Sequence, residues 1–152
     1  MTNIILDIQK SYSNNIYIPR KKDFKIWLKK ILKNKKLTYE ITIRIVDKKE
    51  IKEINLKYRK KNQPTNILSF PNLDTTKKKI KFLGDLIICH TVVQEEAKAQ
   101  KKTLESHWAH MTIHGALHLL GYDHVNKIQQ KIMESLEINI MLALGYINPY
   151  TF

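Results

Sequence analysis

The first half of the chain alternates between strand-like and helix-like hydrophobic patterns. Alternating apolar residues predict strands over 3–8 and 38–46, the second with one solvated face. Apolar residues at helical spacing predict an amphipathic helix over Lys21–Lys36 with a lysine-rich outer face. Asp47 then begins a short helix as its N-cap, with Glu50 three residues on in a capping-box pattern. The buried face of this helix is expected to be Ile51, Ile54 and Tyr58.

The second half carries two short strands and then only helices. A polar loop over 59–65 precedes a strand over Asn66–Phe70, which Pro71 closes. An exposed, lysine-rich loop over 72–81 leads to an apolar strand, Leu83–Cys89, expected to be buried on both faces. The remaining chain predicts three helices, over about 91–101, 104–120 and 126–143.

This mixture of elements predicts an α+β fold. We expect a compact sandwich in which a small, about four-stranded mixed sheet packs against five to six helices. With 152 residues and no internal repeat, the chain is expected to form a single domain over 1–152. The spacing of the elements leaves the order of the strands open.

The chain is strongly basic, with 27 Lys and Arg residues against 14 Asp and Glu residues and a formal charge of +13. Such a surplus favours polyanionic partners, either nucleic acid or an anionic membrane surface. The alternative is a solvated surface shaped by AT-rich codon usage, because all but three of the basic residues are lysines. The arginines are Arg20, Arg44 and Arg59.

The number of cysteines and the hydropathy of the chain indicate the cellular compartment of the protein. The single cysteine, Cys89, excludes an internal disulfide framework and a Cys-rich zinc finger. No apolar run reaches the roughly 18 residues that span a bilayer, and residues 1–7 do not resemble a signal peptide. We therefore expect a cytoplasmic protein without a membrane partner, and its oligomeric state stays open.

Histidine is concentrated in one predicted helix and the turn after it. His114 and His118 are one turn apart, so both leave the same face of the helix. Gly121 is placed to end the helix in a left-handed conformation, which lets His124 return to them. Catalytic zinc commonly takes three protein ligands and keeps a fourth position for water. We therefore expect one Zn²⁺ per chain at the end of this central helix.

Three neutral imidazoles leave the full charge on the metal, which lowers the pKa of bound water toward ~7. The alternatives are histidines that only pack, or a structural zinc whose fourth ligand is Cys89. Imidazole also suits Ni²⁺ and Cu²⁺, so the pattern leaves the physiological metal open. His107 and His110 lie one or two turns back and are expected either to support the site or to pack.

The same spacing occurs in a protease motif, His-Glu-x-x-His-x-x-Gly-x-x-His. His114, His118, Gly121 and His124 match this motif, but Gly115 stands where the protease needs its glutamate base. A glycine cannot abstract a proton. The pattern therefore favours the same metal with a different substrate, and the positive charge points to a phosphodiester.

The segment His114–His124 reads His-Gly-Ala-Leu-His-Leu-Leu-Gly-Tyr-Asp-His and resembles the signature of the YbeY family, the bacterial rRNA maturation endoribonucleases. Further blocks are similar to that family: Asn55–Arg59, Pro64–Pro71 and Leu83–Ile88. The resemblance covers roughly residues 40–145.

The resemblance implies a zinc-dependent endoribonuclease specific for single strands. Its implied work is the maturation of ribosomal RNA, especially the 3′ end of the small-subunit rRNA, and ribosome quality control. The implied zinc ligands are His114, His118 and His124, and the implied catalytic residues are Arg59 and His114. The expected partners are single-stranded RNA, ribosomal RNA and the small ribosomal subunit. The alternatives are a metzincin-like metalloprotease and a non-catalytic ribosome- or RNA-binding factor with a structural zinc.

The chemistry of Arg59 supports a nuclease independently of the resemblance. Phosphodiester cleavage builds negative charge on the non-bridging oxygens, and a guanidinium meets it with a planar pair of donors. The expected nucleophile is either a metal-activated water or the ribose 2′-hydroxyl, and no general base is evident. Asp123 is a candidate to orient a ligand imidazole. Tyr58, Phe70 and Tyr122 are placed to stack on bases, although burial is the commoner fate of such rings.

Overall fold

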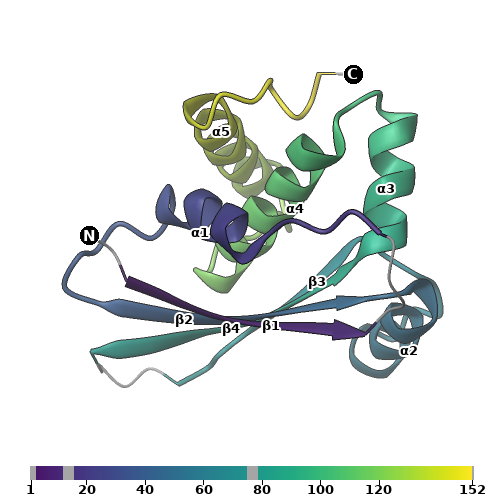
Figure 1. Ribbon diagram of the computed structural model, residues 1–152, viewed down its shortest axis with the longest axis horizontal. Coiled ribbons are helices and arrows are strands. Elements are labelled where there is room, and N and C mark those ends of the chain that lie inside the picture. Colours follow the sequence, from purple (N-terminus) through teal and green to yellow (C-terminus); the bar gives the residue numbers. More distant parts are fainter. Residues whose placement is uncertain (1–2, 12–15, 75–78, 152) are drawn as a thin grey trace.

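The computed structural model describes residues 3–11, 16–74 and 79–151. Among these residues, a four-stranded sheet forms one layer, with four helices on one face and a single helix on the other (Figure 1). On the crowded face lie α1 (Lys21–Lys29), α3 (His90–Ala99), α4 (Leu104–Leu119) and α5 (Lys127–Ala143). The opposite face carries α2 (Lys48–Arg59). The predicted α+β sandwich is confirmed.

The sheet is mixed and has the strand order β1-β2-β4-β3. Three of its strands are parallel, and β3 runs antiparallel to β4 at one edge. The strands are β1 (Asn3–Ser11), β2 (Thr38–Val46), β3 (Ile67–Pro71) and β4 (Ile80–Cys89). The edge strand β3 lies against α4, where the Ser69 hydroxyl donates to the Gly115 carbonyl at 3.4 Å.

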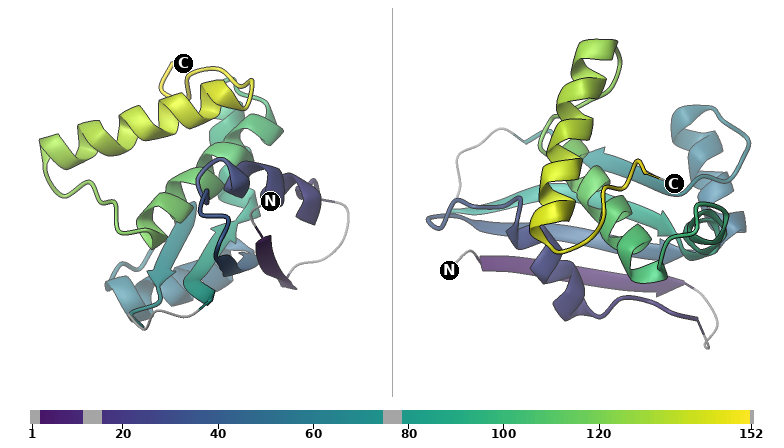
Figure 2. Two further views of the ribbon diagram at one scale, coloured as in Figure 1. Left: turned by 90° about the vertical axis from the view of Figure 1, so that its left-hand side faces the viewer. Right: turned by 90° about the horizontal axis from the view of Figure 1, so that it is seen from above.

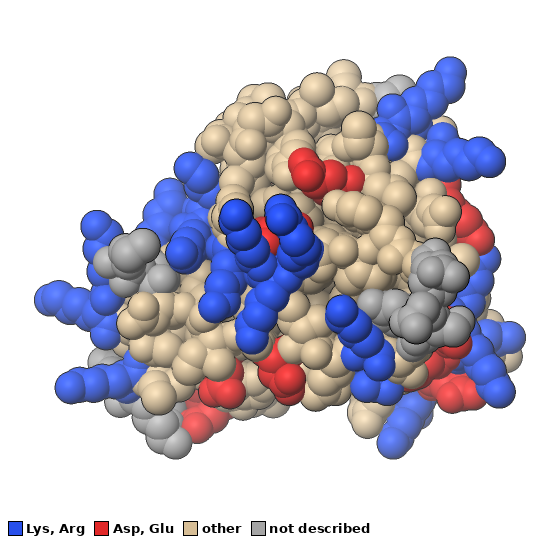
Figure 3. All heavy atoms as spheres, viewed as in Figure 1, with Lys and Arg blue, Asp and Glu red and all other residues tan. Residues whose placement is uncertain are grey.

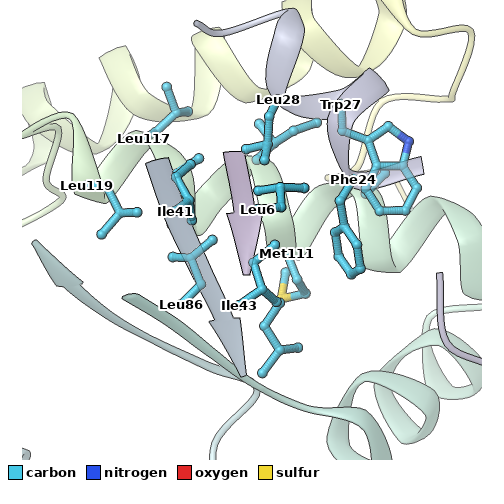
Figure 4. Close-up of a cluster of buried hydrophobic side chains, with 14 of the residues drawn as sticks. Leu6, Phe24, Trp27, Leu28, Ile41, Ile43, Leu86, Met111, Leu117 and Leu119 are labelled. Carbon is cyan, nitrogen blue, oxygen red and sulfur yellow. The ribbon is translucent and has the colours of Figure 1, made fainter. Parts of the chain in front are cut away.

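The main core lies between the sheet and the helices α1 and α4, as Figure 4 shows. The alternation along β2 predicts its two faces correctly, because every second residue is fully or almost fully buried. On α1, the apolar spacing buries one stripe, and the ring of Phe24 meets that of Trp108 on α4 edge-on at 6.2 Å. The residues that the two elements contribute to this main core are Tyr39, Ile41, Ile43, Ile45, Phe24, Trp27 and Leu28.

A second, smaller apolar cluster lies under α2 on the far face of the sheet. It consists of Val46, Ile51, Leu68 and Cys89. Because β4 contributes to both clusters, its second half is buried on both faces, as the continuous apolar run predicts.

Several element boundaries differ from the sequence prediction. The first helix ends at Lys29 and not at Lys36, and the chain then turns at Asn34, whose side-chain oxygen accepts the Lys36 N–H at 3.0 Å. Leu32 is still buried, so the apolar periodicity outlasts the helix. The first strand continues to Ser11, because it pairs with β2 along its whole length.

The lysine-rich loop also ends earlier than predicted, because β4 begins at Ile80 and pairs with β2 from that residue on. The lysines Lys77 and Lys78 of this loop lie outside the described residues.

Helix α2 begins as predicted, because the Asp47 carboxylate accepts the Glu50 N–H at 2.9 Å. The Glu50 side chain does not complete a capping box and instead accepts from Arg44 Nε at 2.6 Å and from Ser11 at 2.7 Å. The predicted burial of Tyr58 is wrong: this ring is 55% exposed.

Asn55 takes the buried place on α2, one turn after Ile51. Its amide donates to the Gln63 carbonyl at 2.9 Å and so secures the loop that follows the helix. The predicted buried face of α2 did not include Asn55 because this residue is polar. A buried amide with a backbone partner can nevertheless replace an apolar residue on the buried face of a helix. No helix in the described part of the chain is long and apolar enough to cross a membrane.

Candidate metal centre and cleft

Helix α4 presents two histidines at its C-terminal end. Thr103 caps the start of the helix by accepting the Ser106 N–H at 3.1 Å. At the other end, Gly121 adopts a φ of +102°, and the Tyr122 N–H donates to the Leu117 carbonyl at 3.1 Å. This reversal confirms the predicted glycine stop and turns the chain back toward the helix.

The turn brings His114, His118 and His124 together. One ligand nitrogen from each of these residues lies within 4.8 Å of the others, so the group is able to hold a metal ion. The Nε2 atoms of His114 and His118 are 3.2 Å apart, and the ring of His124 is 5.0 Å from that of His118. Burial, followed by the neighbouring imidazoles, lowers the pKa of His118 and so favours its neutral, metal-ligating form.

A buried carboxylate from α5 supports this group. Glu137 is 0% exposed and accepts from Nδ1 of His114 through Oε1 and from the hydroxyl of Tyr150 through Oε2. Nε2 of His110 lies 3.7 Å from the same carboxylate. Burial alone would raise the pKa of Glu137, but the nearby imidazole of His110 and the hydrogen bonds from His114 and Tyr150 outweigh it and hold the pKa at about 2. The carboxylate is therefore ionised at neutral pH.

Sequence reasoning missed Glu137, although the chain carries a signal for it. Met133, Glu137 and Met141 are spaced by four residues and form the buried stripe of α5. An acidic residue in register with an apolar stripe is a buried charge, and buried charges need partners. Those partners come from elsewhere in the chain, so the spacing alone does not identify them.

The two other histidines of α4 have different surroundings. His107 is buried and its Nε2 lies 2.9 Å from Oε1 of Glu96 on α3. His110 is also buried, faces Glu137 and meets the ring of Tyr150 edge-on at 5.3 Å. Thus His110 supports the site, and His107 belongs to a separate contact between α3 and α4.

The histidines open onto a cleft of about 660 Å³ between the turn after α4 and the strand β3. Arg59, at the end of α2, lines the same cleft. Its Nη2 donates to the Ser69 carbonyl at 2.8 Å, and its guanidinium lies 5.1 Å from the centre of the Phe70 ring. These two contacts fix the exposed guanidinium on the wall of the cleft.

The remaining candidate residues differ in where they lie relative to the cleft. Tyr122 is 41% exposed and lines the cleft, and the exposed ring of Tyr58 packs edge-on against Phe70 at 5.3 Å. Asp123 does not orient an imidazole; its Oδ1 accepts the backbone N–H of His124 at 2.8 Å. It therefore shapes the turn.

The predicted alternative of Cys89 as a fourth ligand is wrong. Among the described residues, the histidine group contains no cysteine. Cys89 is buried in the cluster under α2, and this burial raises the pKa of its thiol. A protonated thiol in an apolar cluster is a poor metal ligand.

Gly115 is closely packed, so a larger residue there would force neighbouring side chains of β3 and β4 to move. A Cβ atom there would lie 2.5 Å from Cδ1 of Ile67, 2.9 Å from Cδ2 of Leu86 and 3.2 Å from Oγ of Ser69. In the protease motif this position carries the glutamate base. Here β3 and β4 fill the space that such a side chain would need.

Comparison with known proteins agrees with this geometry. The model of the family described as endoribonuclease YbeY matches residues 8–145. The chain belongs to the YbeY family. The family prediction is thereby confirmed, and so, at the level of the family, is the prediction of a hydrolytic endoribonuclease.

Two curated relatives with high sequence identity to this chain are also endoribonucleases of the YbeY family. The endoribonuclease YbeY of Buchnera aphidicola subsp. Acyrthosiphon pisum (strain APS) is 55% identical over 150 residues, covering 99% of this chain and 97% of the relative. That of Buchnera aphidicola subsp. Schizaphis graminum (strain Sg) is 55% identical over 148 residues, covering 97% and 94%. A solution structure from Thermotoga maritima shares the fold with a TM-score of 0.58 at 24% identity, covering 93% of this chain and 92% of that one.

Proposed function

We propose that this chain is a zinc-dependent endoribonuclease that cleaves single-stranded RNA in the cytoplasm. Its proposed substrate is ribosomal RNA on the small subunit, at the 3′ end of the small-subunit rRNA, with a further part in ribosome quality control. The observation that carries the proposal is the group of three imidazoles, with nitrogens within 4.8 Å of one another, in the same cleft as Arg59. One domain would carry both binding and catalysis.

In this proposal His114, His118 and His124 hold the zinc ion. Three imidazoles and an open position are a donor set that suits catalytic zinc. A zinc ion in such a site lowers the pKa of bound water and polarises a phosphoryl oxygen. His114 acts in catalysis by holding the ion at the cleft wall, where Glu137 fixes its ring.

Arg59 would stabilise the negative charge that builds on the non-bridging oxygens during cleavage. Its Nη2 is already engaged by Ser69, so the side chain is held in place before substrate arrives. A donor that needs no rearrangement in the transition state stabilises charge more effectively than a free one.

The surroundings of the cleft fit a single strand. The exposed rings of Tyr58 and Tyr122 offer stacking surfaces, and stacking on bases is worth about 1–3 kcal/mol each. Figure 3 shows basic side chains over α1, on the β1 side of the molecule and away from the cleft beside β3. A surface with a formal charge of +13 attracts the phosphate backbone over a long range.

The geometry disfavours the protease alternative for two reasons. Gly115 supplies no base, and a glutamate there would have to displace the side chains of Ile67 and Leu86. The free edge of β3, where an extended peptide would pair, is also partly blocked. Its outward groups belong to residues 67, 69 and 71, since the Asn66 carbonyl accepts the Cys89 N–H across the sheet. The Ile67 N–H donates to Asn66, the Ser69 carbonyl accepts from Arg59, and Pro71 has no N–H.

A cleavage assay tests the proposal. An end-labelled single-stranded RNA with the small-subunit rRNA 3′ sequence is incubated with the chain as purified, after chelation, and after addition of zinc. The same sequence as a duplex and as DNA tests specificity. The matched variant is His118→Ala, which removes a proposed ligand and leaves the bond between His114 and Glu137 in place.

We expect cleavage of the single strand that disappears with the chelator, returns with zinc and is absent in the variant. A 2′,3′-cyclic phosphate on the product would indicate attack by the ribose hydroxyl, and a linear phosphate would indicate attack by water. Tight metal binding without cleavage of free RNA or of small ribosomal subunits would contradict the proposal and favour a binding factor with a structural zinc.

A further inference from the structure

The segment after α5 reaches the metal centre from a distant part of the chain. Figure 2 shows this segment folding back beside α5 and over α4. We propose that Glu137 and Tyr150 are positioning residues that hold the His114 ring in its metal-binding orientation, so that the C-terminal segment sets the metal affinity of the site. This inference rests on the proposed metal site.

The placement of Glu137 is the first argument. A fully buried carboxylate is costly unless it is paired, and the neighbouring members of its stripe, Met133 and Met141, are apolar. A methionine at position 137 would continue the stripe without that cost. The buried charge is therefore explained by what it contacts, and it contacts His114 directly.

The second argument is which of the two ring nitrogens of His114 contacts Glu137. Glu137 accepts from Nδ1 of His114, so the proton resides on Nδ1 and the lone pair on Nε2. Nε2 is the atom that lies 3.2 Å from Nε2 of His118. The carboxylate thus selects the tautomer that presents a free lone pair to the other two histidines, and its charge increases the basicity of that lone pair.

The third argument is the second oxygen of the carboxylate. The Tyr150 hydroxyl donates to Oε2 of Glu137, so that each carboxylate oxygen has a donor and the group cannot rotate freely. Burial and the adjacent Glu137 raise the pKa of Tyr150, so the hydroxyl keeps the proton that it donates. The ring of Tyr150 also packs edge-on against the ring of His110.

The same segment offers a matched control. The Tyr146 hydroxyl donates to Glu105 at 2.9 Å and accepts from the Trp27 indole at 3.1 Å. Both bonds anchor the segment to the body of the protein, and neither involves Glu137. Tyr146→Phe therefore removes one hydroxyl from the same segment, as Tyr150→Phe does, without changing the surroundings of His114.

The test uses the full chain and four proteins: wild type, Glu137→Met, Tyr150→Phe and Tyr146→Phe. The dissociation constant for Zn²⁺ is measured by competition with a chromogenic chelator, and stability by urea unfolding of the metal-free proteins. We expect zinc binding weakened by roughly 10–100-fold in Glu137→Met and by less in Tyr150→Phe. We expect it unchanged in Tyr146→Phe.

The stability measurement separates positioning from a merely structural role. Replacing a buried charge by an apolar residue of similar volume is often neutral or stabilising, so Glu137→Met should stay folded while it binds zinc more weakly. Nitrogen-15 NMR of the metal-free imidazoles gives a second readout: the Nδ1-protonated form of His114 should dominate in the wild type and lose that dominance in Glu137→Met. If Glu137→Met does not fold, Glu137→Gln is measured in its place.

Three results would overturn the inference. They are unchanged zinc affinity in a folded Glu137 variant, an unchanged His114 tautomer, and equal weakening by Tyr146→Phe and Tyr150→Phe. Wild-type protein that binds no metal would overturn the proposed site together with the inference. Wild-type protein that binds zinc but cleaves no RNA would overturn only the proposed nuclease function.

Discussion

The candidate metal centre joins two regions of opposite character. On one side, His114 projects from α4, a largely buried helix, and is held by the fully buried Glu137. On the other side, His124 lies in a segment, residues 120–126, in which every residue is exposed. The comparison shows how a rigid, protein-facing half can orient the site while a solvent-facing half completes it and gives access to metal and substrate.

The largest expected effect comes from removing one ligand from each side. Both His114→Ala and His124→Ala should abolish zinc binding and RNA cleavage, a loss beyond the roughly 10–100-fold that orienting residues cost. They should differ in stability. His114→Ala leaves Glu137 with one donor fewer in a buried place and should lower the free energy of unfolding by about 1–3 kcal/mol. His124→Ala should change it by less than about 0.5 kcal/mol.

Urea unfolding of the two metal-free variants measures this difference, and metal analysis of the purified proteins measures zinc. Equal destabilisation by both substitutions would refute the contrast between a buried and an exposed half. Zinc retained at wild-type levels in either variant would refute the role of that histidine as a ligand.

Arg59 is exposed like His124 but is fixed like His114, so it tests whether exposure or fixation matters for catalysis. Arg59→Ala should lower kcat by roughly 10²–10³, the usual cost of removing one donor that stabilises transition-state charge. Lys57 is the matched control, an exposed cation on the same helix whose Nζ lies over the Tyr58 ring. Lys57→Ala should lower cleavage only a few-fold. Steady-state kinetics on single-stranded RNA would reject the assignment if both variants behaved alike.

Two glycines with positive φ, one in a packed place and one in an open place, allow the same comparison of buried and exposed regions to be made for the backbone. A Cβ on Gly84, with φ +139°, would lie 2.2 Å from the Phe70 carbonyl oxygen and 3.0 Å from Leu119. On Gly121, with φ +102°, it would meet nothing within 4 Å. Gly84→Ala therefore combines overpacking with backbone strain and should cost about 3 kcal/mol or more.

Gly121→Ala carries the strain alone and should cost about 1 kcal/mol. Chemical denaturation of both variants gives the two values. An equal loss of unfolding free energy in the two variants would mean that the packed surroundings of Gly84 accept a methyl group as easily as the open surroundings of Gly121 do.

The smallest expected effect concerns acid stability at the separate contact between Glu96 on α3 and His107 on α4. Burial alone would raise the pKa of Glu96, but the hydrogen bonds from His107 and Asn66 outweigh it and lower the pKa below its usual value of 4.5. The folded state then binds fewer protons than the unfolded state. This contribution is complete above the unfolded pKa and is lost as the pH falls through the lowered one.

Glu96→Gln should therefore be less stable than the wild type at pH 7, and the difference should shrink below about pH 4.5. Urea unfolding of both proteins at pH values from 7 to 3 measures it. A difference that stayed constant with pH would contradict the lowered pKa.

The sequence predicted the local parts of this molecule well. Strand alternation in β2, the helix spacing of α4 and the stop at Gly121 depend on neighbouring residues, and the structure confirms all of them. The histidine group was predictable for the same reason, because one helical turn and one glycine turn connect its members.

Features that depend on distant contacts could not be predicted in this way. The order of the strands depends on pairing between remote segments, and the length of β1 depends on its partner β2. Glu137 and Tyr150 reach His114 only because α5 and the segment after it pack against α4. Asn55 is buried on α2, and Tyr58 is not, because the carbonyl of Gln63, eight residues later, accepts from the Asn55 amide, and hydrophobic periodicity does not reveal this bond.

The contact between Tyr150 and Glu137 also imposes an order on biosynthesis. A ribosome makes the three histidines well before it makes the residue that locks the carboxylate behind His114. Because Met133 and Met141 of α5 belong to the main core, the core and the orientation of His114 are both completed by the same late-made part of the chain. The proposed metal centre would therefore become fully ordered only after α5 and the segment that follows it have been made.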